Sequence, residues 1–187
     1  KEVLEELKPD VVLVAIGANP IVPPFEGREL PNVSCFTDIY PKLDQLGEHV
    51  CIVGGGMVGV ELAVELLERG HKVTVVEMGK ELAAQGNILY KAGLHRFLDQ
   101  YTDKIVELTG TKCEKFVPEG VVVSNEAQGT FRIDCDNVVI AVGMRSKRQE
   151  AFDLYGVADE TMMFGDCEKV GQVVHATNDA YFIAANI

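Results

Sequence analysis

The chain has 187 residues, of which 47% are hydrophobic and 25% charged, values that are ordinary for a globular protein of one domain or one and a half. Its net charge of −12 argues against a nucleic acid or an anionic membrane surface as partner, because both are themselves negative. No apolar run is long enough to span a bilayer. The five cysteines are scattered, without a Cys-x-x-Cys pair. This argues against a zinc or iron–sulfur site in the chain and favours a reducing, cytoplasmic location.

The N-terminal part predicts a helix end, a strand and an extended segment. Residues 1–8 have helical spacing and are followed by Pro9, and Asp10 to Gly17 reads as a buried strand that runs into glycine. Prolines at 20, 23 and 24 then predict an extended crossing segment, and residues 37–47 a short helix. Because the chain starts without a signal-like segment, we expect an internal piece of a longer protein.

The central motif is a strand, a glycine turn and a helix. The apolar run from Val50 to Val53 precedes glycines at 54, 56 and 59, and Ala63 follows one helical turn later. In such a unit the first glycine permits the tight turn, the second lets backbone approach a diphosphate, and the third lets the helix pack closely on the sheet. The helix start also offers unpartnered N–H groups. The expected pyrophosphate cradle comprises Gly54, Gly55, Gly56, Met57, Val58 and Gly59.

A second buried strand, residues 72–77, ends in Glu77. This acid lies 77 − 54 = 23 positions after Gly54, near the roughly 20 expected for the group that binds the adenosine ribose diol. A carboxylate there repels a 2′-phosphate and no arginine follows, which favours NADH over NADPH. Lys80 is the counter-argument, since one cation could neutralise a phosphate. We count Met78 and Lys80, in the turn after Glu77, among the residues around the dinucleotide.

The rest of the chain completes an α/β pattern. Residues 87–100 predict a helix whose apolar face is Leu89, Leu94, Phe97 and Leu98, and residues 104–108 predict a third strand. Three short strands (111–117, 120–124 and 129–134) predict an antiparallel β-meander. A buried strand at 137–143 closely echoes residues 10–17. A short helix (149–155), a strand (161–166) and a last helix (173–187) follow. The predicted fold is a Rossmann-like parallel sheet with an antiparallel meander.

The order of these pieces resembles the two-dinucleotide flavoprotein fold of the pyridine-nucleotide disulfide reductases and their relatives. Residues 15–20 resemble its first crossing, Gly54 to Ala63 its NAD(P)H fingerprint, Ala141-Val142-Gly143 its second crossing, and Gly165-Asp166-Cys167 its FAD-holding Gly-Asp motif. Residues 47–56 and 75–78 are most similar to the NADH oxidase and 2,4-dienoyl-CoA reductase group, in which a barrel related to old yellow enzyme carries FMN and an iron–sulfur cluster.

The resemblance implies a domain plan and further site residues. Residues 1–46 and 145–187 would be segments of a partial FAD-binding domain that flank an NAD(P)H domain at 47–144. Glu61 would contact the nicotinamide side, Gly143 would admit the nicotinamide end, and Asp166 would bond the ribitol of FAD. Gly17, Ala141 and Val142 belong to the two crossings. The alternatives are a partly buried helix acid for Glu61, a plain turn for Gly143 and a capping or loop acid for Asp166.

Three departures from the family pattern limit what the chain can do by itself. The first glycine fingerprint, which takes the ADP half of FAD, is absent, and so is the dithiol pair of disulfide reductases. The second crossing continues into Met144-Arg145-Ser146 rather than proline, which puts the geometry on the nicotinamide side in question. We therefore expect the NADH-binding portion of an oxidoreductase that passes hydride from NADH to FAD, inactive without the N-terminal flavin domains.

Two other interpretations remain open at the level of sequence. The chain could be a nucleotide-binding regulatory or scaffold module without chemistry, an interpretation that the missing flavin fingerprint supports. Alternatively, Gly54 to Glu77 could take the ADP part of FAD, because this fingerprint is shared by both cofactors. The crossing motifs on both sides of the fingerprint speak against the second alternative.

Overall fold

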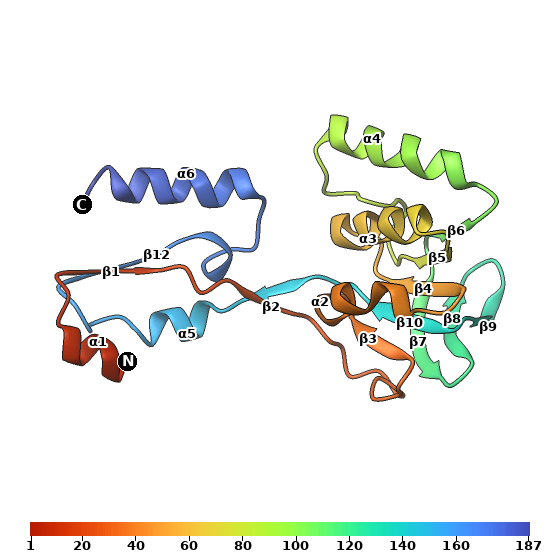
Figure 1. Ribbon diagram of the computed structural model, residues 1–187, viewed down its shortest axis with the longest axis horizontal. Helices are drawn as coiled ribbons and strands as arrows, with labels where there is room; N and C mark the ends of the chain where they lie inside the picture. Colours follow the sequence, from red (N-terminus) through yellow and green to blue (C-terminus); the bar gives the residue numbers. More distant parts are fainter. The chain divides into compact units, whose positions relative to one another are not determined.

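The computed structural model describes all 187 residues, which form two compact units (Figure 1). The first unit combines Lys1–Asn19 with Met144–Ile187, and the second is Pro20–Gly143. The chain thus leaves the first unit once and returns to it once. No helix in either unit combines the length and the apolar character that a bilayer crossing requires.

The second unit is built on a five-stranded parallel sheet. Its strand order is β3 (Val33–Cys35), β10 (Asn137–Ile140), β4 (His49–Val53), β5 (Lys72–Val76) and β6 (Ile105–Leu108). The chain proceeds from β4 to β5 and β6 on one side and returns to β10 on the other side. In open parallel sheets, the crevice at such a reversal, beyond the carboxyl ends of the strands, is the usual place for a ligand. The sheet is therefore Rossmann-like, as predicted.

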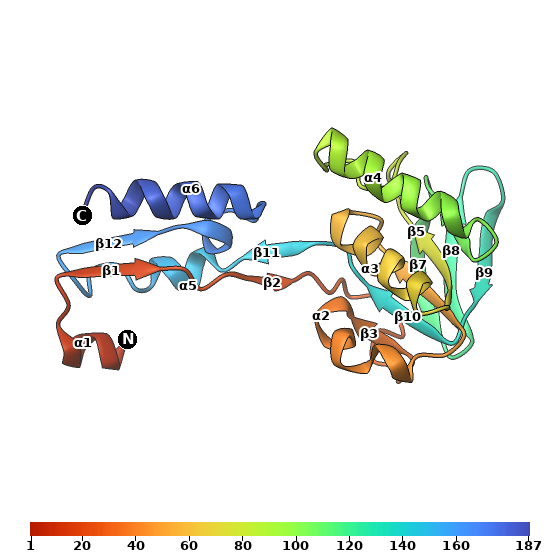
Figure 2. The ribbon, with the colours of Figure 1, turned by 45° about the horizontal axis from the view of Figure 1, so that its top comes forward.

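The sheet has a hydrophobic core on each of its two faces, and successive side chains of β4 point alternately into one core and the other. Val50 and Ile52 pack with the helices α2 (Phe36–Ile39), α3 (Met57–Glu68) and α4 (Ile88–Leu98), whereas Cys51 and Val53 pack with the meander. The meander consists of β7 (Lys112–Val117), β8 (Gly120–Asn125) and β9 (Gly129–Asp134), all antiparallel. Figure 2 shows the helices and the meander on opposite sides of the sheet. The predicted meander is thus confirmed.

Two helices of this unit differ from their predictions. The helix expected at 37–47 is the single turn α2 followed by the 3-10 helix η1 (Tyr40–Gln45), because Pro41 lacks the N–H that would continue α2. The short 3-10 helix η2 (Asp99–Tyr101) extends α4. In α4, Leu94 and Leu98 are buried as predicted, but Leu89 is 81% exposed. The helix packs through its second half, so its first turn contributes nothing to the core.

The first unit has a small core around a parallel pair, β1 (Val11–Val14) and β12 (Glu160–Met163). Its helices are α1 (Glu2–Leu7), α5 (Arg148–Phe152), the 3-10 helix η3 (Gly165–Cys167) and α6 (Val173–Ala184). The core consists of Val12, Val14, Ala151, Met163 and Cys167. No residue of α6 is buried. Two short strands that the sequence did not reveal, β2 (Ala18–Pro20) and β11 (Met144–Ser146), pair where the chain passes between the units.

Candidate functional site

Three glycines between β4 and α3 have different surroundings. Gly54 has φ +112°, and a Cβ there would lie 2.3 Å from the carbonyl oxygen of Ala141, just beyond β10. A Cβ on Gly59 would lie 1.9 Å from the carbonyl oxygen of Gly54. By contrast, Gly56 has an ordinary φ of −67°, and no atom lies within 4 Å of its Cβ position. Gly54 and Gly59 therefore allow backbone segments to approach each other closely, whereas Gly56 borders open space.

The first turn of α3 presents free backbone donors. The first bond of the helix runs from Val60 N–H to Gly56 O at 3.0 Å, so the amides of Met57, Val58 and Gly59 lie before it. Gly56 is the N-cap and provides no side chain to satisfy them, and no acid lies in the first turn. These amides carry partial positive charge, which suits a phosphate group.

Glu77 lies against this glycine turn, as its spacing predicted. Its Oε2 accepts the Gly55 N–H at 2.7 Å, and its Oε1 accepts the Gly79 N–H at 2.6 Å. The residue is half-buried at the end of β5. Because each carboxylate oxygen has about two acceptor sites, each can take a further hydrogen bond from a ligand hydroxyl. The two hydrogen bonds from the backbone thus fix the carboxylate and leave acceptor sites on both oxygens free for a ligand.

A segment after β5 supports the turn from the other side, and the sequence did not indicate it. Leu82 is buried so close to Gly55 that a Cβ there would lie 2.4 Å from its Cδ2. The N–H of Ala83 donates to Gly55 O at 2.8 Å, with Ala83 held at φ +50°. Alanine gives no sequence signal for a left-handed conformation, in contrast to glycine. This contact was therefore not predictable from residue types.

Glu61 lies in the second turn of α3 and is half-exposed. Its Oε1 accepts a hydrogen bond of 2.9 Å from the hydroxyl of Tyr90 in α4. This hydrogen bond raises the pKa of Tyr90. The pKa of Tyr40 is raised as well, first by its burial and then by the charges of Glu61 and Glu65. The partner of Glu61 was not predicted, because nothing in the sequence relates two positions 29 residues apart.

The remaining predicted residues of this unit surround the same strand ends. Ala141 is buried against Gly54, and Val142 is half-buried. Gly143 has φ +117°, and its carbonyl accepts the Ile21 N–H at 2.9 Å. Met78 is 69% exposed, and Lys80 is exposed beside it. The structure thus brings the glycine turn, Glu77 and the second crossing together.

Gly17 and Asp166 belong to the first unit. Gly17 has φ +74°, with no atom within 4 Å of its Cβ position. Asp166, in η3, accepts the Gly171 N–H at 3.1 Å through Oδ1. His175 caps α6 by accepting the Gln172 N–H at 3.1 Å. Together with the Gln172 side chain, which accepts from the backbone of His175, this contact forms a capping box.

A separate hollow of about 450 Å³ opens at the amino end of β4, at the opposite end of the strand from the glycine turn. Its polar lining is His49, Glu119, Asp134 and Asp136, with Pro118 and Cys135. No group of His, Cys, Asp and Glu side chains in the chain is arranged to hold a metal ion. We regard the glycine turn as the candidate site, because it alone combines free helix amides with a fixed carboxylate.

The sequence and the fold of this chain are similar to those of known proteins. The family model of the pyridine nucleotide-disulphide oxidoreductases matches residues 1–176. The chain is 34% identical over 183 residues to a bilirubin reductase of Mediterraneibacter gnavus, covering 96% of this chain and 28% of that protein. It is 29% identical over 199 residues to an NADH oxidase of Thermoanaerobacter brockii, covering all of this chain and 29% of the oxidase.

A solved structure supports the same family relationship. The structure of a 2-naphthoyl-CoA reductase superposes with a TM-score of 0.91 at 28% identity, over all of this chain and 28% of the reductase. The chain thus spans less than a third of the length of these relatives. The predicted resemblance to NADH oxidase-type flavoproteins is confirmed, and the chain belongs to the pyridine nucleotide-disulphide oxidoreductase family.

Proposed function

We propose that the chain is the NADH-binding portion of a flavin-dependent oxidoreductase. The observation that carries the proposal is the Glu77 carboxylate, held by the Gly55 N–H at 2.7 Å beside the uncapped start of α3. In such an arrangement the amides before the first helical bond bind the diphosphate, and the carboxylate binds the ribose hydroxyls. The open space at Gly56 provides room for the diphosphate to approach the backbone.

The same carboxylate favours NADH over NADPH. A 2′-phosphate would replace the 2′-hydroxyl that Glu77 accepts and would bring two negative groups together. Lys80 is exposed three residues later, so its charge is largely screened by solvent. We infer that NADH binds at least tenfold more tightly than NADPH, a difference of about 1.4 kcal/mol.

In the intact protein, bound NADH would supply a hydride to the flavin of FAD. The role of this chain is to bind and orient the dinucleotide, and we assign it no acid–base residue. Gly17 and Asp166 would contribute to the FAD site together with flavin domains outside this chain, which could also carry FMN and an iron–sulfur cluster. The NADH oxidase and the 2-naphthoyl-CoA reductase among the relatives support an NADH oxidase or an enoate or 2,4-dienoyl-CoA reductase-like enzyme. The scattered free cysteines support a cytoplasmic location.

Titration of the purified chain with NADH and NADPH, followed by nicotinamide fluorescence, tests this proposal. The unmodified chain should prefer NADH at least tenfold, and Glu77→Ala should reduce that preference because the ribose loses its acceptor. Glu126→Gln, which removes one exposed negative charge in the turn between β8 and β9, is the matched control and should leave both affinities unchanged.

Three results would oppose the proposal in different ways. A preference for NADPH would remove Glu77 from its role. Binding of FAD at the glycine turn, seen as a yellow chain whose colour is lost in Glu77→Ala, would support the shared-fingerprint alternative. Absence of binding by either dinucleotide would contradict the proposal as a whole.

A further inference from the structure

Two cysteine thiols lie together beside the hollow at the amino end of β4. Cys51 is on β4 and has no exposed surface, whereas Cys135 lies between β9 and β10 and is 8% exposed. Both pack in the core between the sheet and the meander, where their thiols are close enough to interact directly. Both are free, and the proposed function uses neither. Two adjacent thiols, in contrast to a single one, can be joined to each other by oxidation.

The backbone holds Cys135 against the end of β4. The N–H of Cys135 donates to Glu119 O, in the turn before β8, at 3.0 Å. The next residue, Asp136, donates its N–H to His49 O at 2.9 Å, and its Oδ2 accepts the His49 N–H at 2.8 Å. Cys51 lies two residues further along β4. The segment that carries Cys135 is therefore tied both to the meander and to the strand that carries Cys51.

The two thiols differ in how a reagent from solvent can reach them. Cys135 belongs to the lining of the hollow of about 450 Å³, and Cys51 does not. Interaction with Cys51 lowers the pKa of Cys135 against the opposing effect of burial, which favours the nucleophilic thiolate at Cys135. The third thiol of this core, Cys113, is 3% exposed, and burial raises its pKa to about 12. A small neutral oxidant in the hollow would therefore meet Cys135 first.

We propose that Cys135 and Cys51 form a peroxide-sensitive thiol pair, which closes to a disulfide between β4 and the connection from β9 to β10. In the first step the Cys135 thiolate attacks one oxygen of hydrogen peroxide and the O–O bond breaks. Cys135 becomes a sulfenic acid, and the hydroxide that leaves combines with the proton released by the thiol. In the second step the Cys51 sulfur attacks the Cys135 sulfur, the S–O bond breaks, and the oxygen leaves as water with the Cys51 proton. Two thiols are thus oxidised, and one peroxide is reduced to two waters.

This thiol pair is separate from the candidate dinucleotide site. It lies at the amino end of β4, whereas the glycine turn follows the carboxyl end of the same strand. The inference therefore does not rest on the proposed function, and a failure of either leaves the other unaffected.

The test is peroxide treatment of the reduced 187-residue chain, followed by peptide mapping without reductant by mass spectrometry. The chain should lose two hydrogen atoms and yield two peptides joined through Cys51 and Cys135, and dithiothreitol should reverse both changes. In Cys51→Ala the second step is impossible, so labelling of Cys135 sulfenic acid by dimedone should rise at least about tenfold. Cys35→Ala is the matched control, because it removes a half-buried thiol of β3 outside this core and should leave the disulfide yield unchanged.

The peptide map of the unmodified chain tests the inference even if Cys51→Ala does not fold. A disulfide between Cys51 and Cys113, or oxidation of Cys135 to a sulfinic acid without a cross-link, would overturn the pairing. An unmodified Cys135 at peroxide concentrations that oxidise Cys35 would overturn it as well, because the hollow would then give the oxidant no access. Equal dimedone labelling of Cys135 with and without Cys51 would contradict the second step.

Discussion

Gly56 and Gly59 are both part of the fingerprint, yet the structure separates their roles. A Cβ on Gly59 would lie 1.9 Å from the carbonyl oxygen of Gly54, so Gly59→Ala must push α3 away from the turn. We expect this substitution to lower the free energy of unfolding by about 1–3 kcal/mol. Gly56→Ala meets no atom within 4 Å and should leave stability nearly unchanged, while its methyl group blocks the approach of the diphosphate.

Thermal or denaturant unfolding, combined with NADH titration, measures both effects. The expected pattern is reduced stability for Gly59→Ala and reduced NADH affinity at unchanged stability for Gly56→Ala. If Gly56→Ala bound NADH as well as the unmodified chain, the diphosphate would not lie on this part of the backbone. If Gly59→Ala were as stable as the unmodified chain, the close packing of α3 on the turn would be contradicted.

Three core cysteines of the second unit should differ in reactivity. Burial raises the pKa of Cys113 to about 12, so only ~1 in 10,000 of its thiols is ionised at pH 8. Interaction between the neighbouring thiols of Cys51 and Cys135 lowers the pKa of Cys135, whereas the same interaction and burial raise the pKa of Cys51. The lower pKa leaves more thiolate at a given pH, and Cys135 should therefore react first.

Alkylation with iodoacetamide at pH 8, followed by mass spectrometry of peptides, checks this order. Cys135 should be modified before Cys51 and Cys113 in the folded chain, and the three should react at similar rates after denaturation. Modification of Cys113 as fast as Cys135 in the folded chain would contradict the difference in their surroundings.

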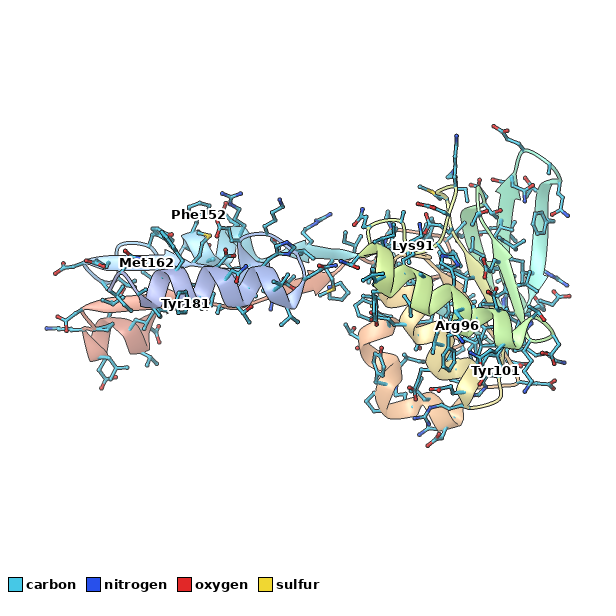
Figure 3. The ribbon with its side chains drawn as sticks, turned by 90° about the horizontal axis from the view of Figure 1, so that it is seen from above. Lys91, Arg96, Tyr101, Phe152, Met162 and Tyr181 are labelled. Carbon is cyan, nitrogen blue, oxygen red and sulfur yellow. The ribbon has the colours of Figure 1, made fainter.

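At the scale of elements, α3 and α6 are both twelve residues long but differ in packing. Six residues of α3 are buried, and Gly70, which follows the C-cap Arg69, has φ +95°, a left-handed conformation that suits the end of a helix. In α6 no residue is buried, and Val173, Val174, Tyr181 and Phe182 are exposed, Tyr181 being visible in Figure 3. Helices of this length take most of their stability from packing.

This difference predicts unequal protection of the two helices. In the 187-residue chain, the amides of α6 should exchange with deuterium about 100-fold faster than those of α3, because local opening of α6 exposes little buried surface. Hydrogen exchange read by mass spectrometry measures this directly. Protection of α6 equal to that of α3 would mean that its apolar side chains are covered in solution, for example by a second copy of the chain.

At the scale of the whole molecule, local patterns predicted most elements and the position of the acid beside the glycine turn. The alternating or continuous apolar runs predicted β4, β5, β10 and the meander, and the spacing of Gly54 and Glu77 correctly placed the acid at the turn. The short strand β3 was missed, since three residues carry too little periodicity. The pairing of Tyr90 with Glu61 was missed because it depends on how α4 packs on α3, which neither helix pattern encodes.

The central claim is that a reduced pyridine nucleotide lies on the start of α3, with its diphosphate on the free amides and its ribose on Glu77. A crystal structure of the chain with NADH is the most direct measurement. The account predicts density for the diphosphate within hydrogen-bond distance of the amides of residues 57–59, and a ribose hydroxyl at the carboxylate of Glu77. An empty glycine turn at saturating NADH, or density for the dinucleotide elsewhere, would contradict it.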